Sequence, residues 1–212
     1  MRFEDLIDRL ANRPDALPPP AVGVIPVFTG SAAMRPPATP LDRAAVRPAA
    51  VLVLLFPDEA GDARVVLTER VTRDGHHSGE VSFPGGRAEP DDANLIATAL
   101  REAAEEVALD AAAANVRVIG ELERFWIPVS NYEMTPVLAL AERRPILVAS
   151  PDEVASILTP RVADFLPHAP MEIVERTIRD WPIRYGAFRV DGLSVWGATA
   201  RVLSQLGAML AR

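Results

Sequence analysis

The chain has 212 residues, a formal net charge of −7 and 24% charged residues, and no stretch carries a dense basic run. A main partner of nucleic acid is therefore not expected, because such binding needs clustered cations. Cysteine is absent, which excludes disulfides, thiol nucleophiles and cysteine-based zinc sites. The charged, then proline-rich residues 1–20 do not form a signal peptide, and the longest apolar run, 49–56, is too short to span a membrane. These features predict a cytoplasmic protein.

The expected elements alternate between helix and strand without a regular repeat. Residues 3–13 have the spacing of an amphipathic helix, and the proline-rich residues 14–48 form an irregular arm. The apolar run 49–56 predicts a buried strand, which a turn joins in a hairpin to a second strand at 63–70. The other expected elements are a Gly-Gly turn at 85–86, a helix at 92–109, strands at 116–122 and 134–141, a helical turn at 151–158, a hairpin at 179–190 and a helix at 195–211.

This order predicts an α/β fold in a single domain, residues 1–212. Residues 1–47 are the terminal helix and arm, and residues 48–203 are the core. Three roles stay open for the arm: covering a sheet edge, exchanging with a partner subunit in a homodimer, or remaining loosely ordered.

The helix predicted at 92–109 gathers carboxylates on one face. At about 100° per residue, the charged side chains fall within an arc of roughly 140° and the apolar side chains lie opposite. The charged set is Arg101, Glu102, Glu105 and Glu106; the apolar set is Ile96, Leu100, Ala103, Ala104 and Val107. Clustered carboxylate oxygens suit Mg²⁺ or Mn²⁺, and a cation held in this way suits phosphoryl chemistry.

A solvated glutamate face is the alternative interpretation of this helix. The preceding run Phe83-Pro84-Gly85-Gly86 favours the metal site, because glycine lets the backbone turn sharply and approach a ligand closely.

The glycines and the helix together resemble the box of the Nudix hydrolase family, G-x5-E-x7-R-E-U-x-E-E-x-G-U, where U is a bulky aliphatic residue. The matching residues are Gly86, Asp92, Arg101, Glu102, Ala103, Glu105, Glu106 and Leu109. Asp92 stands in place of the first Glu, and the spacer to Arg101 is one residue longer than in the box. Ala108 replaces the last glycine, and Ala103 is small for its position. The Arg-Glu and Glu-Glu pairs are intact.

An upstream stretch is similar to the pattern L-L-T-x-R-S-x3-R-x3-G-x3-F-P-G-G of the coenzyme A pyrophosphatases within this family. The matching residues are Leu67, Thr68, Arg70, Gly79, Phe83, Pro84, Gly85 and Gly86. Val71 and Gly75 depart from the pattern, and Arg73 lies two residues before the second arginine position. The longer box spacer, the run Thr98–Glu102 and the run Val195–Ala200 are also similar to that subfamily.

The resemblance implies an α/β/α sandwich with a mixed central β-sheet. It implies metal-dependent hydrolysis of the pyrophosphate bond of coenzyme A or a derivative, giving 3′,5′-phosphoadenosine and phosphopantetheine. Glu102, Glu105, Glu106 and the carbonyl of Gly86 would hold Mg²⁺ or Mn²⁺, and Arg101 would orient the glutamates.

Other residues are candidates for contact with the substrate. Arg70 and Arg73, with Gly85 and Gly86, would bind its phosphates, and Glu153 would be a general base outside the box. His76 and His77 fit either a substrate contact or a polar loop, whereas Trp126 and Tyr132 fit either adenine stacking or core packing. Two other functions stay open. The first is hydrolysis of another diphosphate compound, either ADP-ribose or a nucleoside triphosphate. The second is a non-catalytic binding module, against which the intact glutamates argue.

Overall fold

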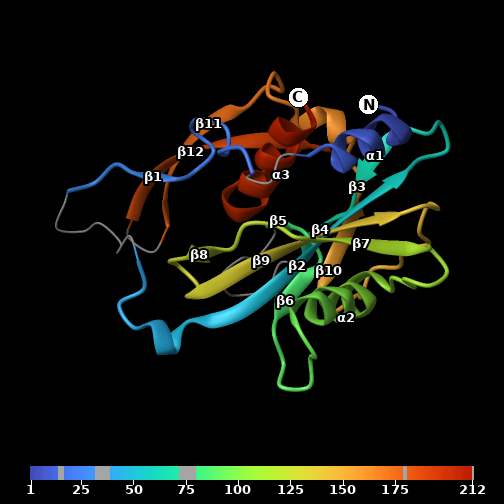
Figure 1. Cartoon of the computed structure of the whole chain (residues 1–212). Coiled ribbons are helices and arrows are strands. Elements are labelled where there is room, and N and C mark those ends of the chain that lie inside the picture. Colours follow the sequence, from blue (N-terminus) through green and yellow to red (C-terminus); the bar gives the residue numbers. More distant parts are fainter. Residues whose placement is uncertain (14–16, 32–38, 72–79, 179–180, 212) are drawn as a thin grey trace.

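The computed structural model describes residues 1–13, 17–31, 39–71, 80–178 and 181–211, so the predictions for Arg73, His76 and His77 lie outside the described residues. A six-stranded sheet forms the centre of the molecule, with β3, β2, β9 and β7 in that order (Figure 1). Strand β6 also pairs with β2, and β8 pairs with β9. The bounds are β2 (Arg47–Pro57), β3 (Ala63–Val65), β6 (Gly85–Arg87), β7 (Val116–Glu121), β8 (Phe125–Ile127) and β9 (Tyr132–Ala141). The sheet is mixed, because β2 and β9 run parallel and the other pairs run antiparallel.

Alternate residues of β2 enter two separate cores. Ala50, Leu52, Leu54 and Phe56 pack with helix α2 (Leu95–Val107), and Val51, Val53 and Leu55 pack with helix α3 (Gly197–Leu210). Successive side chains of a strand point to opposite faces, so a strand covered on both faces is a continuous apolar run. Figure 1 shows the two helices on opposite sides of the sheet. The predicted α/β/α sandwich is confirmed.

The termini meet on the α3 side of the sheet. Helix α1 (Phe3–Ala11) buries Leu6 and Leu10 in the same core as α3, and the Arg9 guanidinium donates to the carbonyl of Leu210. No helix within the described ranges is long and apolar enough to cross a membrane.

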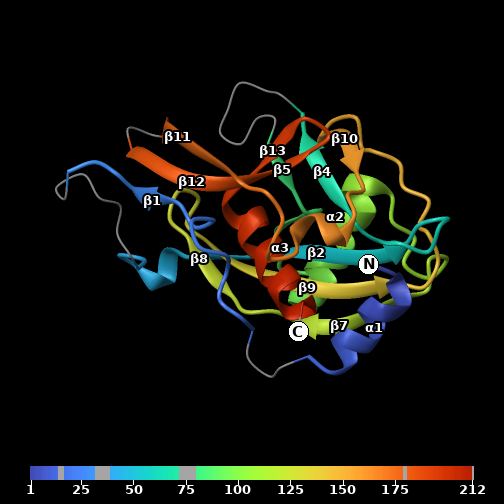
Figure 2. The ribbon, with the colours of Figure 1, turned by 90° about the horizontal axis from the view of Figure 1, so that it is seen from above.

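Two smaller sheets flank the central one (Figure 2). In the first, β4 (Leu67–Arg70) lies between β10 (Val154–Leu158) and β5 (Val81–Ser82). In the second, β12 (Trp181–Val190) lies between β1 (Val27–Phe28) and β11 (Glu172–Ile178), and it also pairs with β13 (Leu193–Val195). Short 3-10 turns lie at Arg43–Ala45 and Val162–Phe165. The arm thus covers an edge of β12 through β1, which is one of the three roles left open for it.

Several predicted elements were wrong in detail. The strand expected at 63–70 divides, because β3 pairs with β2 whereas β4 pairs with β5 and β10. The helical turn expected at 151–158 is instead strand β10, whose residues pair with β4 across a bulge. The hairpin expected at 179–190 starts earlier, since β11 already pairs with β12 from Glu172. Each error concerns a long-range partner, which local residue patterns do not specify.

The glycine pair was also placed wrongly. Gly85 and Gly86 do not form a turn but lie in β6, opposite Val51 and Ala50 of β2. A Cβ at Gly85 would come within 2.4 Å of the Ala50 carbonyl oxygen, so glycine is needed here for close approach of two backbones.

Candidate active site

Helix α2 is shorter than predicted and has two distinct ends. The Asn94 side chain caps the first turn by accepting from the Ala97 N–H at 2.9 Å. The helix ends at Val107, and Ala108 follows in the left-handed conformation with φ 52°. Glycine is the usual residue at such a helix end. The departure Ala108 from the family box therefore places a side chain where the backbone favours glycine.

Glu102 of α2 lies directly against β6. A Cβ on Gly86 would come within 2.6 Å of the Glu102 carboxylate, so a larger residue here would push that carboxylate from its position. The carboxylate and the backbone of β6 therefore share one small region.

Glu106, one turn further along, is 2% exposed. Its Oε2 accepts from the Gly85 N–H at 3.3 Å, and the Arg70 Nη1 lies 3.9 Å from its Oε1. The alternative interpretation, a solvated glutamate face, is therefore wrong for Glu106, because β4 and β6 cover this side of α2 and a helical wheel carries no information on them.

The buried Glu106 and the half-buried Glu102 are costly in their charged forms. Burial raises the pKa of Glu106 to about 7, and the negative charges of Glu102 and Glu153 add to this rise. Arg70 and the Gly85 N–H lower the pKa but do not offset burial. Burial also raises the pKa of Glu102, against the opposing effect of Arg101. Arg101 beside Glu102 and Arg70 beside Glu106 do not fully offset this cost, and a divalent cation would add the missing positive charge.

Arg101 is held on one edge and presents the other edge to the glutamates. Its Nε and Nη2 donate to the two oxygens of Asp92 at 3.0 and 3.1 Å. Its Nη1 lies 3.0 Å from both Glu102 Oε1 and Glu105 Oε2, and its Nη2 also donates to the Arg87 carbonyl. Two oxygens on one planar guanidinium edge fix its orientation. This geometry is compatible with the orienting role that the resemblance implied for Arg101.

Glu153 reaches the same region from another part of the chain. The turn before β10 holds it: Val71 donates its N–H to the Glu153 carbonyl at 3.0 Å, and the Glu153 N–H donates to the Ser150 carbonyl at 3.1 Å. Ser150 in turn donates its N–H to the Glu106 carbonyl at 2.8 Å. The Glu153 side chain is exposed, and its charge acts on both Glu102 and Glu106. The structure thus brings Glu153 and Arg70 to the helix that carries the box.

The donor chemistry of this region fits a hard divalent cation. Carboxylates and a backbone carbonyl are the oxygen ligands that Mg²⁺ and Mn²⁺ accept, and such ions retain several waters. Within the described parts of the chain, no three His, Cys, Asp or Glu side chains are already spaced to hold one ion. On α2, the Glu105 side chain is 57% exposed and pairs with Arg101. Glu102 and Glu106 are in place beside β6, and Glu105 would have to leave Arg101 to join them.

The aromatic candidates already have partners. The Trp126 Nε1 donates to the Asn131 side chain at 2.9 Å, and the Arg47 guanidinium lies 4.2 Å from the centre of the Tyr132 ring. Both aromatic side chains are half-buried. Leu67 and Phe83 of the upstream pattern are core residues, so their part in the pattern is packing, whereas Arg70 lies beside Glu106.

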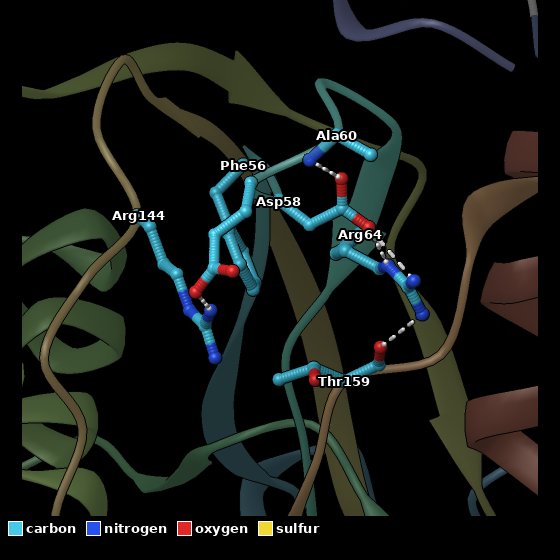
Figure 3. A pocket seen from close by; sticks show the side chains of 7 residues that line it. Phe56, Asp58, Ala60, Arg64, Arg144 and Thr159 are labelled. Carbon is cyan, nitrogen blue, oxygen red and sulfur yellow. Dashed lines mark hydrogen bonds and ion pairs between the residues drawn. The ribbon is translucent and has the colours of Figure 1, made fainter.

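A hollow of about 370 Å³ lies elsewhere, at the far end of β2 (Figure 3). Its rim includes two guanidinium groups, each already paired: Arg64 with Asp58 at 2.7 Å and Arg144 with Glu59 at 2.7 Å. Phe56, which lines it, is six residues beyond Ala50 on β2, or roughly 20 Å along the strand. This hollow is separate from the carboxylates of α2.

The fold and the site together define an α/β sandwich protein in which helix α2, with its carboxylates, lies against strand β6, which contains Gly85 and Gly86. The NUDIX domain family model matches residues 46–181, and the chain belongs to this family. It is 35% identical over 171 residues to Nudix hydrolase 15, mitochondrial, of Arabidopsis thaliana; the match covers 76% of this chain and 58% of the plant protein. It is 36% identical over 151 residues to the uncharacterized Nudix hydrolase NudL of Citrobacter koseri, covering 69% of this chain and 74% of that protein.

A crystal structure of the Nudix hydrolase RenU from M. smegmatis has 19% identity and a TM-score of 0.49, covering 75% of this chain and 81% of that one.

Proposed function

We propose that this protein is a metal-dependent hydrolase of diphosphate bonds in nucleoside diphosphate compounds, and that its substrate is coenzyme A or a derivative. The observation that carries the proposal is the pair of the half-buried Glu102 and the buried Glu106 beside Gly85 and Gly86, with Glu153 and Arg70 at the same place. Such a pair is costly for stability unless a cation occupies it, which points to a functional site.

Glu102 and Glu106 would hold Mg²⁺ or Mn²⁺ with the Gly86 carbonyl, and Glu105 would complete the set. The cation supplies charge for the phosphate oxygens and lowers the pKa of a water. Arg101 keeps Glu102 in place, and Arg70 and the backbone of Gly85 and Gly86 bind phosphate oxygens.

In the hydrolysis itself, a water oxygen forms a bond to one phosphorus while the bridging P–O bond breaks. Glu153 would take the proton of the water. The leaving phosphate oxygen carries the electron pair of the broken bond. For coenzyme A, the products are 3′,5′-phosphoadenosine and phosphopantetheine.

The coenzyme A part rests on the upstream pattern Leu67–Gly86 and the run Val195–Ala200. Val71 and Gly75 depart from that pattern, which leaves ADP-ribose and nucleoside triphosphates as outcomes of the test. A cytoplasmic location is part of the proposal and rests on the sequence alone, whereas the plant relative is named as mitochondrial.

A substrate panel with Mg²⁺, Mn²⁺ or excess chelator tests the proposal. We expect cleavage of coenzyme A at its pyrophosphate and none in chelator. Turnover of ADP-ribose or a nucleoside triphosphate with coenzyme A inert would remove the coenzyme A part alone. Turnover that persists in chelator, or no turnover of any diphosphate, would overturn the metal-dependent hydrolase.

A further inference from the structure

Asp92 lies at the centre of a hydrogen-bond network that holds Arg101. It accepts from the Arg101 Nε at 3.0 Å on Oδ1, and from the Arg101 Nη2 at 3.1 Å on Oδ2. Its Oδ2 also accepts from the Thr98 hydroxyl at 2.8 Å and from the Glu89 N–H at 2.9 Å. The Asp92 side chain is 7% exposed. The Arg101 hydrogen bonds, followed by the Glu89 N–H, hold the pKa of Asp92 well below its usual range.

Thr98 is the member of this network that belongs to the core. It is 0% exposed, and its hydroxyl has two acceptors within reach: Asp92 at 2.8 Å and the Asn94 carbonyl at 3.4 Å. A hydroxyl has one hydrogen to donate, and the shorter bond to a charged oxygen is the stronger one. Thr98 therefore points its hydrogen at Asp92 and, with the Glu89 N–H on the same oxygen, restrains the rotamer of that carboxylate.

The network continues from Asp92 to the glutamates. Asp92 occupies the Nε and Nη2 edge of Arg101, which leaves Nη1 to contact Glu102 and Glu105 at 3.0 Å each. The order of contacts is Thr98, Asp92, Arg101 and then the two glutamates. Rotation of the Asp92 carboxylate would release the Arg101 edge, and Glu102 would lose its fixed partner.

We infer that Thr98 is a positioning residue: its buried hydroxyl holds Asp92, and through Asp92 and Arg101 it sets the position of the carboxylates that bind the divalent cation. This inference rests on the proposed function. This positioning role fits a chain in which an aspartate is the acidic residue that holds Arg101. Asp92 lies before the cap Asn94, and its short side chain reaches both Arg101 and the Thr98 hydroxyl in the first turn of α2.

Valine is the matched replacement, since it keeps the shape of threonine and removes the hydroxyl. For Thr98→Val we expect Mn²⁺ affinity, measured by electron paramagnetic resonance without substrate, to fall by about 10–100-fold, a usual effect of losing a group that orients a metal ligand. We expect kcat to fall with KM little changed. Thr98→Ser keeps the hydroxyl and should restore both quantities to within about twofold of wild type.

Thr135→Val is the matched control. Thr135 is also 0% exposed, but its hydroxyl has no hydrogen-bond partner among the described residues, so its loss removes none of the bonds seen there. Its Mn²⁺ affinity should equal that of wild type. Melting in chelator shows whether each variant folds, and if Thr98→Val does not fold, the comparison of Thr98→Ser with Thr98→Ala replaces it.

Two results would overturn the inference. One is a folded Thr98→Val, or Thr98→Ala, that binds Mn²⁺ and turns over as wild type does. The other is a Thr98→Ser as impaired as those variants, which would assign the effect to the methyl group. Glu102→Gln separates a failure of the proposed metal site from a failure of the positioning role. Unchanged Mn²⁺ binding in Glu102→Gln refutes the metal site itself. Loss of Mn²⁺ binding in Glu102→Gln, with wild-type binding in the Thr98 variants, refutes only the positioning role.

Discussion

The two helices that cover the central sheet bury polar groups in opposite ways. On α3, the buried Ser204 and Gln205 have neutral side chains that bond to backbone groups: Ser204 accepts from the Ala21 N–H, and Gln205 donates to the Pro18 carbonyl. On α2, the buried Thr98 hydroxyl has a partner in Asp92, but the buried carboxylate of Glu106 has, among the described residues, a 3.3 Å bond from Gly85 and an arginine at 3.9 Å. Neutral groups with partners stabilise a fold, whereas a desolvated acid without a close cation does not. The difference marks α3 as a structural helix and α2 as the helix of the site.

The largest expected effect is on activity, at Glu106. Glu106→Gln keeps the shape and removes a charged oxygen ligand, so kcat should fall by about 10²-fold or more, as for loss of one strong electrostatic contact in a transition state. Melting in chelator should show a fold at least as stable as wild type, because burial of a charge is relieved. Steady-state kinetics at saturating Mg²⁺ measure the effect. Glu89→Gln is the control, since Glu89 is exposed and precedes the helix; activity equal in both variants would contradict the assignment.

The matching substitution on α3, Gly207→Ala, should affect stability rather than activity. A Cβ on Gly207 would lie 1.9 Å from the Phe165 carbonyl oxygen, which is backbone and does not yield easily. Gly207→Ala should therefore lower the free energy of unfolding by about 3 kcal/mol or more, at the upper end of overpacking costs. Denaturant titration gives this value. Mn²⁺ affinity of the protein that remains folded should be unchanged, and a selective loss of metal binding would undo the distinction between the two helices.

The pH dependence of stability should distinguish the two faces further. The pKa of Glu106 is about 7 in the folded protein, above the ordinary glutamate value of 4.5 that holds in the unfolded chain. In chelator, the unfolded chain loses this proton first as the pH rises, so the Glu106 contribution to stability is complete below pH 4.5 and lost by about pH 7. The slope is at most about 1.4 kcal/mol per pH unit. Urea titrations between pH 4.5 and 8 should show it in wild type and not in Glu106→Gln; equal slopes would assign it to another group.

The smallest expected effect concerns the end of α2. Ala108 has φ 52°, a conformation that costs a non-glycine residue about 1–2 kcal/mol. Ala108→Gly should stabilise the protein by about 1 kcal/mol or less, since glycine also gains freedom in the unfolded chain. For a chain of this size the melting temperature should rise by about 2–4 °C. Ala104→Gly, at an exposed position inside the same helix, should instead lower it.

The sequence predicted the layers of this fold because they depend on local patterns. The apolar run 49–56 predicted a strand buried on both faces, and the wheel of 92–109 predicted one helix with Arg101 and the glutamates together. Contacts between residues distant in sequence were not predictable in this way. No local residue pattern places Gly86 against Glu102, and none predicts that residues 154–158 form strand β10. For the same reason, the helical spacing did not decide whether Glu106 is solvated or covered, since its cover comes from β4 and β6.

The sequence also gave Asp92 no role beyond its place in the family box. Its separation of six residues from Thr98 matches no helical spacing, because Asp92 lies before the helix cap. The sequence feature that could have indicated a role for Thr98 is a polar residue at a helix position that is buried.

Titration of the chelator-treated protein with Mn²⁺, followed by electron paramagnetic resonance, tests most directly whether α2 holds a divalent cation. The account predicts saturable binding to wild type at pH 8, where Glu106 is charged, and at least tenfold weaker binding to Glu106→Gln. Wild-type protein that binds no Mn²⁺, or a Glu106→Gln variant that binds it equally well, would contradict the account.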